Sequence, residues 1–382
     1  MHVLSIGMDR KLFVDGSAVL ERSKEYAKKM EELHIIVFSL KEHNLKFMKV
    51  DNLYIYPTNS SNKLLYFYNA YEVGKEIIEN MRVKIGNLDN LTLTSQDPFE
   101  TGLVTYFFSR KFNLPLQIQI HTDFLDSHFK TSFLNIIRQV IADFIIPKAN
   151  RIRVVGENIK NSLIQRYRGI DEKIDVLPIY IDINELITTY PKRDIKKDFP
   201  EFNKIILMAS RLTKEKRIDV ALDSFEKVLL KIPNVGLVIC GEGRELEVLK
   251  RNAKYSGISK NVVFLPWQED MVSYYKTADV FLLTSEYEGY GMTLIEAGAS
   301  GCPMVVTRVG VAKSGLFVDD RNSGVCPVGD TDCISGKIIE LLENPTKRDL
   351  FKRKMQDSIK NISKTKEEYV SKYVYYLEKT LK

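Results

Sequence analysis

The sequence predicts an α/β protein built from two Rossmann-like domains that face each other across a cleft. Short apolar runs alternate with helical stretches along most of the chain. Strands that are separated by such helices pair in parallel, with helices covering both faces of the sheet. The 382 residues exceed the size that one hydrophobic core usually serves, and the alternation stops and restarts around a charged, proline-bounded stretch at 182–200.

The first domain is expected to cover residues 1–185, and the stretch at 182–200 is the candidate hinge. Its strands are predicted where apolar residues run together, at 3–6, 35–40, 53–56, 91–95, 116–121, 151–155 and 174–177. Its helices are predicted at 17–32, 64–80, 101–112, 129–147 and 159–167.

The second domain is expected to cover residues 200–359 and to repeat the same rhythm. Its strands are predicted at 204–209, 235–240, 262–265, 279–284 and 304–307. Its helices are predicted at 218–231, 245–256, 271–277, 292–300 and 334–343, and the charged tail from 348 to 382 is also expected to be helical.

Composition excludes several classes of protein. There are 56 Lys and Arg residues and 50 Asp and Glu residues, so the net charge of +6 is too small to indicate a nucleic-acid partner but suits an anionic substrate or membrane surface. Apolar runs stay short of the roughly 20 residues that a spanning helix needs, and the N-terminus reads as a strand rather than a signal peptide. The four cysteines form no CxxC pair, which predicts reduced thiols in a cytoplasmic protein.

A strand, a glycine turn and a helix follow one another around the run SEYEGYGMTLIEAGASGCP at 285–303. Such an arrangement exposes backbone amides at the helix N-terminus, where the helix dipole favours a phosphate. Glu288 precedes the turn, and Glu296 lies in the second turn of the helix. Two carboxylates on either side of a bound diphosphate could accept hydrogen bonds from sugar hydroxyls, so the run predicts a nucleotide-sugar site.

Two cations follow the first strand of the second domain. Arg211 and Lys216 leave the carboxyl end of that strand, where ligands of open α/β sheets bind. Their charges could neutralise a diphosphate leaving group, although a solvated charged loop is the alternative. Gly241 belongs to a GxG that permits either close ligand approach or a plain turn. The sequence lacks GxGxxG after a strand and lacks a P-loop motif, which argues against both of those nucleotide sites.

The first domain offers weaker candidates. Gly16 lies between the first strand and its helix, as either a phosphate contact or a turn glycine, and His121 ends a strand at the same sheet edge. The segments 106–111 and 128–138 mix aromatic and basic residues. Such helices usually pack on their own sheet, and the alternative is an amphipathic surface that lies on an anionic leaflet.

These motifs carry a resemblance to a known family. Glu288 and Glu296 with the Glu-Gly-Tyr-Gly turn between them, together with Ser-Arg-Leu at 210–212 and Lys216, resemble the retaining GT-B glycosyltransferases of family four. The resemblance is strongest over about 204–330. It implies an acceptor-binding first domain, a nucleotide-sugar-binding second domain, and a last helix at 360–382 that returns to the first domain.

The resemblance also implies a role for each site residue. Arg211 and Lys216 correspond to the diphosphate-binding pair, Glu296 to the acid on the ribose, and Glu288 to the acid that faces the transferred sugar. The residues assigned to catalysis are Arg211, Lys216, Glu288 and His121. The residues assigned to donor binding are Gly16, Gly241, Phe264, Leu265, Gly289, Tyr290, Gly291, Met292, Thr293 and Glu296. One departure is Asp15, which stands where the family usually has the first glycine of a pair.

The activity implied is transfer of a hexose, with retention, from a nucleoside-diphosphate sugar to a glycan or lipid-linked acceptor. No bound metal or other cofactor is expected, and the setting implied is surface-polysaccharide or glycolipid assembly, in the cytoplasm or peripherally at the inner face of the plasma membrane. The alternatives on the same architecture are a nucleotide-sugar epimerase, a phosphorylase with a pyridoxal lysine, and a non-catalytic nucleotide-sugar-binding subunit.

Overall fold

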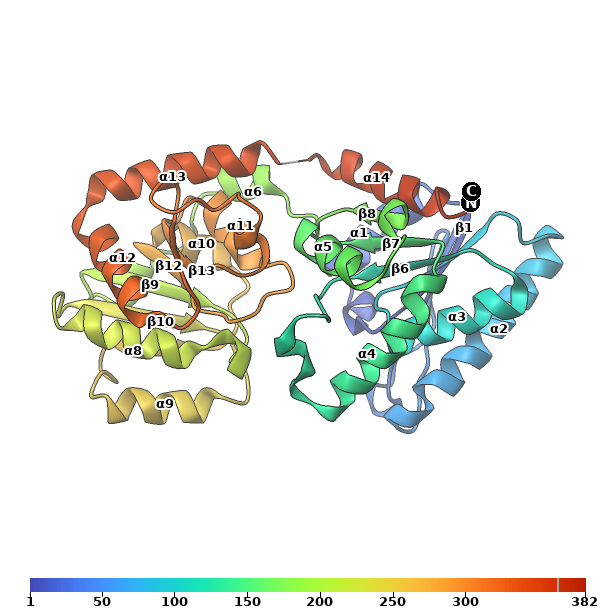
Figure 1. Ribbon diagram of the computed structural model, residues 1–382, viewed down its shortest axis with the longest axis horizontal. Coiled ribbons are helices and arrows are strands. Elements are labelled where there is room, and N and C mark those ends of the chain that lie inside the picture. Colours follow the sequence, from blue (N-terminus) through green and yellow to red (C-terminus); the bar gives the residue numbers. More distant parts are fainter. Residues whose placement is uncertain (363) are drawn as a thin grey trace. The chain divides into compact units, whose positions relative to one another are not determined.

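A computed structural model describes residues 1–362 and 364–382, with the side chains of His128 and Thr131 outside the description (Figure 1). The chain forms two compact units. Unit 1 comprises Met1–Pro178 and Thr365–Lys382, and unit 2 comprises Ile179–Lys364. Each unit is an open sheet covered by helices, as the sequence predicts.

The sheet of unit 1 has the strand order β3-β4-β2-β1-β5-β6-β7-β8. Its strands are β1 (His2–Gly7), β2 (Glu32–Val37), β3 (Met48–Val50), β4 (Leu53–Pro57), β5 (Leu91–Ser95), β6 (Leu116–Ile120), β7 (Arg151–Val154) and β8 (Ile174–Val176). All neighbours pair in parallel except β3, which is antiparallel to β4. The edge strand β3 was not predicted, because its three residues are only partly buried and carry no apolar run.

The helices of unit 1 are α1 (Ala18–Ala27), α2 (Tyr66–Ile85), α3 (Glu100–Phe112), α4 (Phe133–Ile145), α5 (Glu157–Arg166) and α14 (Lys366–Glu378). The predicted helix at 17–32 ends five residues early, because Glu32 already belongs to β2. The predicted helix at 129–147 begins only at Phe133, where Ser132 caps it by accepting a hydrogen bond from the Asn135 amide.

The C-terminal helix α14 packs on the polar face of the unit 1 sheet. Leu116, Ile118 and Ile120 of β6 are buried apolar residues, whereas the alternate positions carry Gln117 and Gln119. Gln117 donates to the carbonyl of Tyr376, and Gln119 donates to the hydroxyl of Tyr373. Buried amides of β6 therefore find their hydrogen-bond partners on α14, which makes this helix part of unit 1.

The sheet of unit 2 is parallel throughout, in the order β11-β10-β9-β12-β13-β14. Its strands are β9 (Lys204–Ala209), β10 (Val235–Cys240), β11 (Val262–Leu265), β12 (Val280–Leu283), β13 (Met304–Thr307) and β14 (Gly324–Cys326). Its helices are α6 (Ile183–Thr188), α7 (Ile195–Asp198), α8 (Ile218–Leu229), α9 (Leu246–Tyr255), α10 (Met271–Thr277), α11 (Met292–Ala299), α12 (Thr331–Glu343) and α13 (Pro345–Lys360). The strand order reverses between β9 and β12, which is where open α/β sheets bind ligands.

The domain boundaries differ from the prediction. Residues 179–199 belong to unit 2 rather than to the first domain or a hinge. The reason is that Ile183 of α6 and Ile195 of α7 are buried in the core of unit 2, and Lys196 pairs with the buried carboxylate of Asp279 at 2.9 Å. The charged run in this stretch therefore flanks buried residues of the second core. The charged tail is likewise two helices, α13 in unit 2 and α14 in unit 1.

The cysteines correct another expectation. Cys326, at the end of β14, and Cys333, in the first turn of α12, form a disulfide, whereas Cys240 and Cys302 are free and buried. The two bonded cysteines are seven residues apart, and the turn between β14 and α12 brings them together. The prediction of four reduced thiols is therefore wrong for this pair. In the part of the chain that the structure describes, each helix is too short or too polar to cross a membrane.

Candidate functional site

The candidate site of unit 2 lies where the loops after β9 and β12 meet, at the reversal point of the sheet. Lys216 comes from the loop after β9, and Glu288 comes from the loop after β12. The Lys216 ammonium lies 2.6 Å from Glu288 Oε1, and both side chains are almost buried, at 12% and 11% exposure. Ser285 Oγ donates to the same carboxylate oxygen at 2.7 Å. The pair therefore holds a cation and an acid in a fixed relative position.

Hydrogen bonds to backbone carbonyls hold these two loops together. The hydroxyl of Thr284 donates to the carbonyls of Lys216 and Arg217, at 3.0 and 2.8 Å. The amide of Glu286 donates to the carbonyl of Glu215 at 3.0 Å. The loop after β9 therefore cannot move independently of the loop after β12. The backbone position of Lys216 is thus fixed relative to the sheet.

Arg211 is less constrained than Lys216. Its side chain is 77% exposed and lies 3.7 Å from Glu215 Oε1. Burial alone would raise the pKa of Glu215, but a hydrogen bond from Thr213 and the charges of Arg211 and Lys216 outweigh it, so this pKa lies below its ordinary value. The two predicted cations therefore leave the same loop with different surroundings: Lys216 is locked on Glu288, and Arg211 extends into solvent beside an ionised acid.

Glycines allow the loops after β9 and β10 to touch. A Cβ at Gly241 would stand 1.9 Å from the carbonyl oxygen of Ser210, and the φ of Gly241 is +150°. A Cβ at Gly243 would stand 2.2 Å from the carbonyl oxygen of Leu212. Of the two interpretations that the GxG allowed, the structure shows close approach between two loops. Ser210 Oγ is buried beside them without a hydrogen-bond partner among the described residues.

The glycine turn before α11 is packed against a second glycine. Gly291 caps α11 with a φ of +94°, and the carbonyl of Tyr290 accepts from the amide of Val311 at 2.7 Å. A Cβ at Gly310 would stand 2.6 Å from that carbonyl oxygen and 2.8 Å from Cβ of Glu288. The turn from Glu288 to Gly291 therefore depends on Gly310, which sequence reasoning missed because the contact spans about twenty residues.

The helix N-terminus after this turn is open to a ligand. Gly289, Tyr290 and Thr293 are half-buried, and Met292, the first residue of α11, is 37% exposed. The first amides of a helix lack intrahelical acceptors and point along its axis. The arrangement supplies hydrogen-bond donors and a positive dipole end next to Glu288, as expected for an anion site.

Glu296 lies farther along α11 and is half-buried. Its Oε2 accepts a hydrogen bond from the hydroxyl of Tyr275 at 3.2 Å. Burial raises the pKa of Glu296, and the Tyr275 bond opposes that shift. Tyr275 is itself buried, on α10, and holds the carboxylate in one orientation. Tyr275 was not among the predicted site residues, since only the packing of α10 on α11 reveals it.

Two further predicted donor contacts belong to the neighbouring strand. Phe264 and Leu265 end β11 and are half-buried. The carbonyl of Leu265 accepts from the amide of Gly241 at 2.9 Å, which joins the end of β11 to the loop after β10. The ends of β11, β10, β9 and β12 thus form one continuous edge of unit 2.

Unit 1 contains the remaining predicted residues. His121 follows β6, and its Nε2 is buried without a hydrogen-bond partner among the described residues. Burial, followed by the charges of Arg153 and Arg22, lowers the pKa of His121 to about 3, so its imidazole is neutral at physiological pH. Gly16 has a φ of +71° in an exposed turn after β1, where its amide donates to Asp15 Oδ1 at 3.1 Å.

Comparisons with known proteins find relatives of this chain. Residues 191–358 match the family model described as "Glycosyl transferases group 1". The chain is 24% identical over 387 residues to N-acetyl-alpha-D-glucosaminyl L-malate synthase of Bacillus anthracis, covering 98% of this chain and 97% of that protein. It is 25% identical over 287 residues to alpha-monoglucosyldiacylglycerol synthase of Streptococcus pneumoniae, covering 72% of this chain and 62% of that protein.

A solved structure shares the fold of the whole chain. HepE of Anabaena, solved in complex with UDP-glucose, superposes with a TM-score of 0.75 at 16% identity, covering 98% of this chain and 99% of that one. The matched family model spans the part of unit 2 that carries Arg211, the Lys216–Glu288 pair and Glu296.

Proposed function

We propose that this chain, a glycosyltransferase of the GT-B fold whose residues 191–358 match the group 1 glycosyl transferase model, transfers a hexose from a nucleoside-diphosphate sugar. The acceptor that we propose is a glycan or a lipid-linked group, and the anomeric configuration is retained. The streptococcal relative, named for a glucosylated diacylglycerol, supports a lipid-linked acceptor.

The observation that carries the proposal is the Lys216–Glu288 pair beside the N-terminus of α11. We assign the diphosphate to the α11 amides, to Lys216 and to the exposed Arg211. Charge that develops on the leaving diphosphate during transfer is stabilised by these fixed donors. We assign Glu288 to hydroxyls of the transferred sugar, because a carboxylate held by Lys216 and Ser285 is oriented before substrate arrives.

Glu296 takes the ribose in this proposal. A half-buried carboxylate held by Tyr275 can accept hydrogen bonds from two neighbouring hydroxyls. Phe264 and Leu265, at the end of β11, are assigned to the nucleobase, and Gly241 to the backbone turn beside it. The resemblance assigns donor contacts to His121 and Gly16. For His121, the low pKa supports a neutral imidazole that exchanges hydrogen bonds without carrying charge.

We further propose that transfer needs no bound metal or other cofactor. Lys216 and Arg211 supply the positive charge that a divalent ion would otherwise bring to a diphosphate. Turnover is therefore expected to persist in EDTA. Loss of turnover in EDTA, with recovery on adding Mg²⁺ or Mn²⁺, would contradict this part of the proposal. We place the reaction in surface-polysaccharide or glycolipid assembly, in the cytoplasm or at the inner face of the plasma membrane.

The test begins with a thermal-shift screen of nucleoside diphosphates and their sugars, because a ligand that binds the folded state raises the melting temperature. UDP-sugars come first, since HepE was solved with UDP-glucose. Each donor that shifts the melting temperature is then incubated with and without acceptors, and release of the nucleoside diphosphate is measured. The acceptors include diacylglycerol, short glycans and L-malate; the last is chosen because the full-length Bacillus relative is named for an L-malate product.

The outcomes separate the alternatives. Acceptor-dependent release of nucleoside diphosphate, with a product of unchanged anomeric configuration by NMR, supports the proposal. Conversion of the donor sugar without an acceptor would instead indicate an epimerase. A thermal shift without turnover on any acceptor would favour a nucleotide-sugar-binding subunit.

A further inference from the structure

The helix α4 of unit 1 exposes a stripe of large apolar side chains. The outward residues, here called the α4 face, are Phe133, Leu134, Ile136, Ile137, Val140 and Phe144. Their exposed fractions range from 41% for Ile137 to 78% for Phe133. The spacing of three, four and seven residues places them on one side of the helix, whereas Ala142 and Ile145 face the core. The outer face of this helix is thus as apolar as its buried face.

The charged residues of α4 are both engaged elsewhere. Arg138 donates to Glu100 of α3 at 2.8 Å, and Asp143 accepts from Arg166 and Tyr167 at 2.8 and 2.5 Å. These pairs turn the two charges toward neighbouring elements. The α4 face consequently presents apolar side chains to its surroundings, without the polar surface that a solvated helix shows in water.

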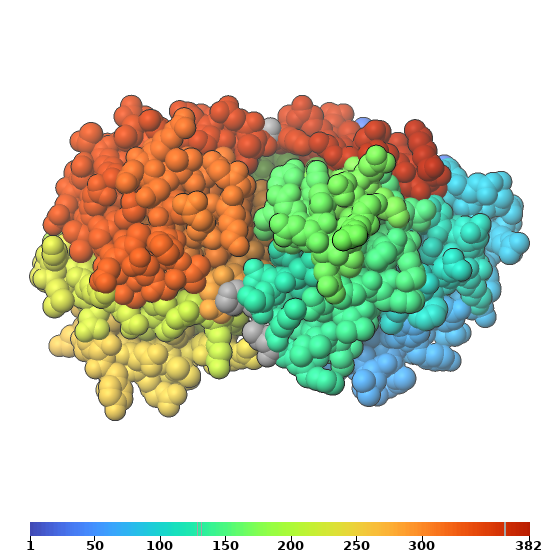
Figure 2. Space-filling model, in the orientation of Figure 1, coloured from blue at the N-terminus to red at the C-terminus, as the bar shows by residue number. Residues whose placement is uncertain are grey.

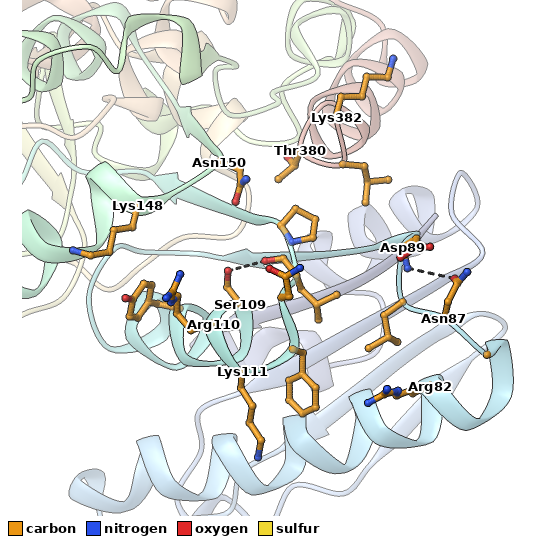
Figure 3. Close-up of a pocket in the computed structure, with 18 residues that line it drawn as sticks. Arg82, Asn87, Asp89, Ser109, Arg110, Lys111, Lys148, Asn150, Thr380 and Lys382 are labelled. Carbon is orange, nitrogen blue, oxygen red and sulfur yellow. Dashed lines mark hydrogen bonds between the residues drawn. The ribbon is translucent and has the colours of Figure 1, made fainter.

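A basic surface continues directly from the carboxyl end of the α4 face. The Lys148 ammonium lies 3.6 Å from the centre of the Phe144 ring, and the ring of Tyr106 meets Phe144 edge-on at 5.3 Å. Tyr106, Lys148 and Arg110 line the same groove of unit 1 (Figure 3). Among the described residues that line this groove, five are basic and one, Asp89, is acidic.

The groove places cations from three elements around one surface. Figure 3 shows Arg82 of α2, Arg110 and Lys111 of α3, and Lys148 after α4 around it. The helices α2, α3 and α4 lie side by side in unit 1, and α4 is at its outer surface (Figures 1 and 2). Apolar and cationic surfaces are therefore adjacent.

We propose that the α4 face and this basic groove together dock on a membrane surface that contains anionic lipid. A helix of 13 residues is about 20 Å long, well short of the roughly 30 Å hydrocarbon core, so α4 lies in the plane of the interface rather than crossing it. The apolar side chains enter the region between headgroups and acyl chains, and the cations of the groove attract lipid phosphates. This inference does not depend on the sugar that unit 2 binds.

The charge distribution favours a bilayer over a second copy of the chain as the occupant. Two copies of this surface would bring cationic grooves near one another, and like charges oppose association. An anionic leaflet complements both parts of the surface at once. Self-association through α4 is therefore an outcome that the experiment must detect.

Vesicle flotation of the full chain tests the proposal. Vesicles of phosphatidylcholine alone are compared with vesicles that also contain about 30% phosphatidylglycerol, which supplies a negative surface potential. The wild-type protein is expected to float with the anionic vesicles and to be released as salt is raised. Replacing two exposed side chains, Phe133→Ser with Val140→Ser, is expected to weaken binding by roughly tenfold or more, since each buried apolar group contributes to interfacial affinity.

Two controls make the result specific. Leu230→Ser with Tyr255→Ser removes two apolar side chains of unit 2 that are 83% and 96% exposed, and should leave flotation unchanged. Arg110→Glu with Lys148→Glu should abolish the preference for anionic vesicles while the α4 face stays intact. Circular dichroism and the melting temperature of each variant show that it is folded.

Several results would overturn the proposal. These are no flotation of the wild type with anionic vesicles, equal flotation of the Phe133→Ser/Val140→Ser variant, and equal binding to neutral and anionic vesicles. Analytical ultracentrifugation that shows a dimer broken by the α4 variant, without vesicle binding, would assign the face to self-association. Nucleotide-induced thermal shifts of the same variants report on unit 2 separately, so failure here leaves the proposed transfer reaction intact.

Discussion

Lys216 and Glu288 form an ion pair of 2.6 Å although 71 residues stand between them in the sequence. They meet because β9 and β12 are neighbours in the sheet, each strand ending in the loop that carries one of the two residues. The pair is nearly buried, at 12% and 11% exposure, so its geometry is part of the fold rather than a surface contact. A cation and an acid are thereby held beside the α11 N-terminus before any donor binds.

Replacing Lys216 by Ala is expected to lower kcat by roughly 10²- to 10³-fold, because the lost ammonium stabilises charge that develops on the leaving diphosphate. The measurement is steady-state release of nucleoside diphosphate with donor and acceptor. Lys214→Ala is the matched control: Lys214 lies in the same loop, is exposed, and should retain turnover. Wild-type turnover in the Lys216→Ala protein would contradict the assignment of Lys216 to the leaving diphosphate.

The half-buried carboxylate of Glu296 should affect nucleotide binding and protein stability in opposite directions. Its raised pKa means that the folded state binds this proton more tightly than the unfolded state, so the stabilising contribution is full below pH 4.5 and is lost as pH rises through the folded pKa. Glu296→Gln removes the charge, and its melting temperature should therefore gain on the wild type as pH increases. Calorimetry should show weaker binding of a nucleoside diphosphate, because the ribose loses its anionic acceptor. Unchanged affinity would contradict the ribose role.

Tyr275→Phe separates orientation from charge at the same position. The Tyr275 hydroxyl lowers the pKa of Glu296, so its removal should move the acid limb of nucleotide binding to higher pH while leaving Glu296 in place. The measurement is the dissociation constant as a function of pH. A profile identical to that of the wild type would show that the hydrogen bond does not tune this carboxylate.

Two glycines, one tightly packed and one in open space, test the contact between the loops after β9 and β10. Gly241→Ala should destabilise unit 2 by about 2 kcal/mol or more, since its Cβ would stand 1.9 Å from the Ser210 carbonyl oxygen at a φ of +150°. Gly336→Ala lies inside α12, where the added Cβ meets nothing within 4 Å, and should stabilise by a few tenths to 1 kcal/mol. Chemical denaturation of both variants measures the two free energies of unfolding. Equal changes in the free energy of unfolding would show that the close approach of Gly241 to Ser210 does not require glycine.

The sequence predicts most of this architecture because strands and helices each leave a recognisable pattern within a short stretch of residues. The apolar run of β9 and the charged loop that ends at Lys216 are both visible in a short window. The ion pair of Lys216 with Glu288 is a consequence of strand order, which no local pattern contains. The same holds for position 310, which requires glycine only because its loop packs on the carbonyl of Tyr290.

Local charge misled the prediction at one place where packing outweighs it. The stretch at 182–200 looks like a hinge, yet Ile183 and Ile195 anchor it in the core of unit 2. The return of the last helix to the first domain was expected from the resemblance alone, and the structure shows that α14 gives Gln117 and Gln119 of β6 their hydrogen-bond partners. Buried contacts between residues far apart in the sequence decide where both segments belong.

The attachment of α14 to unit 1 can be tested through Tyr373. Its ring stacks on that of Tyr26 at 4.1 Å, and its hydroxyl accepts a hydrogen bond from Gln119. Tyr373→Ala should destabilise unit 1 by about 3–5 kcal/mol, because the lost aromatic ring leaves a cavity and one N–H of Gln119 loses its acceptor. Tyr375→Ala removes a 50% exposed ring from the same helix and should cost far less. If chemical denaturation gave the two variants equal stability, α14 would not be an integral part of the unit 1 core.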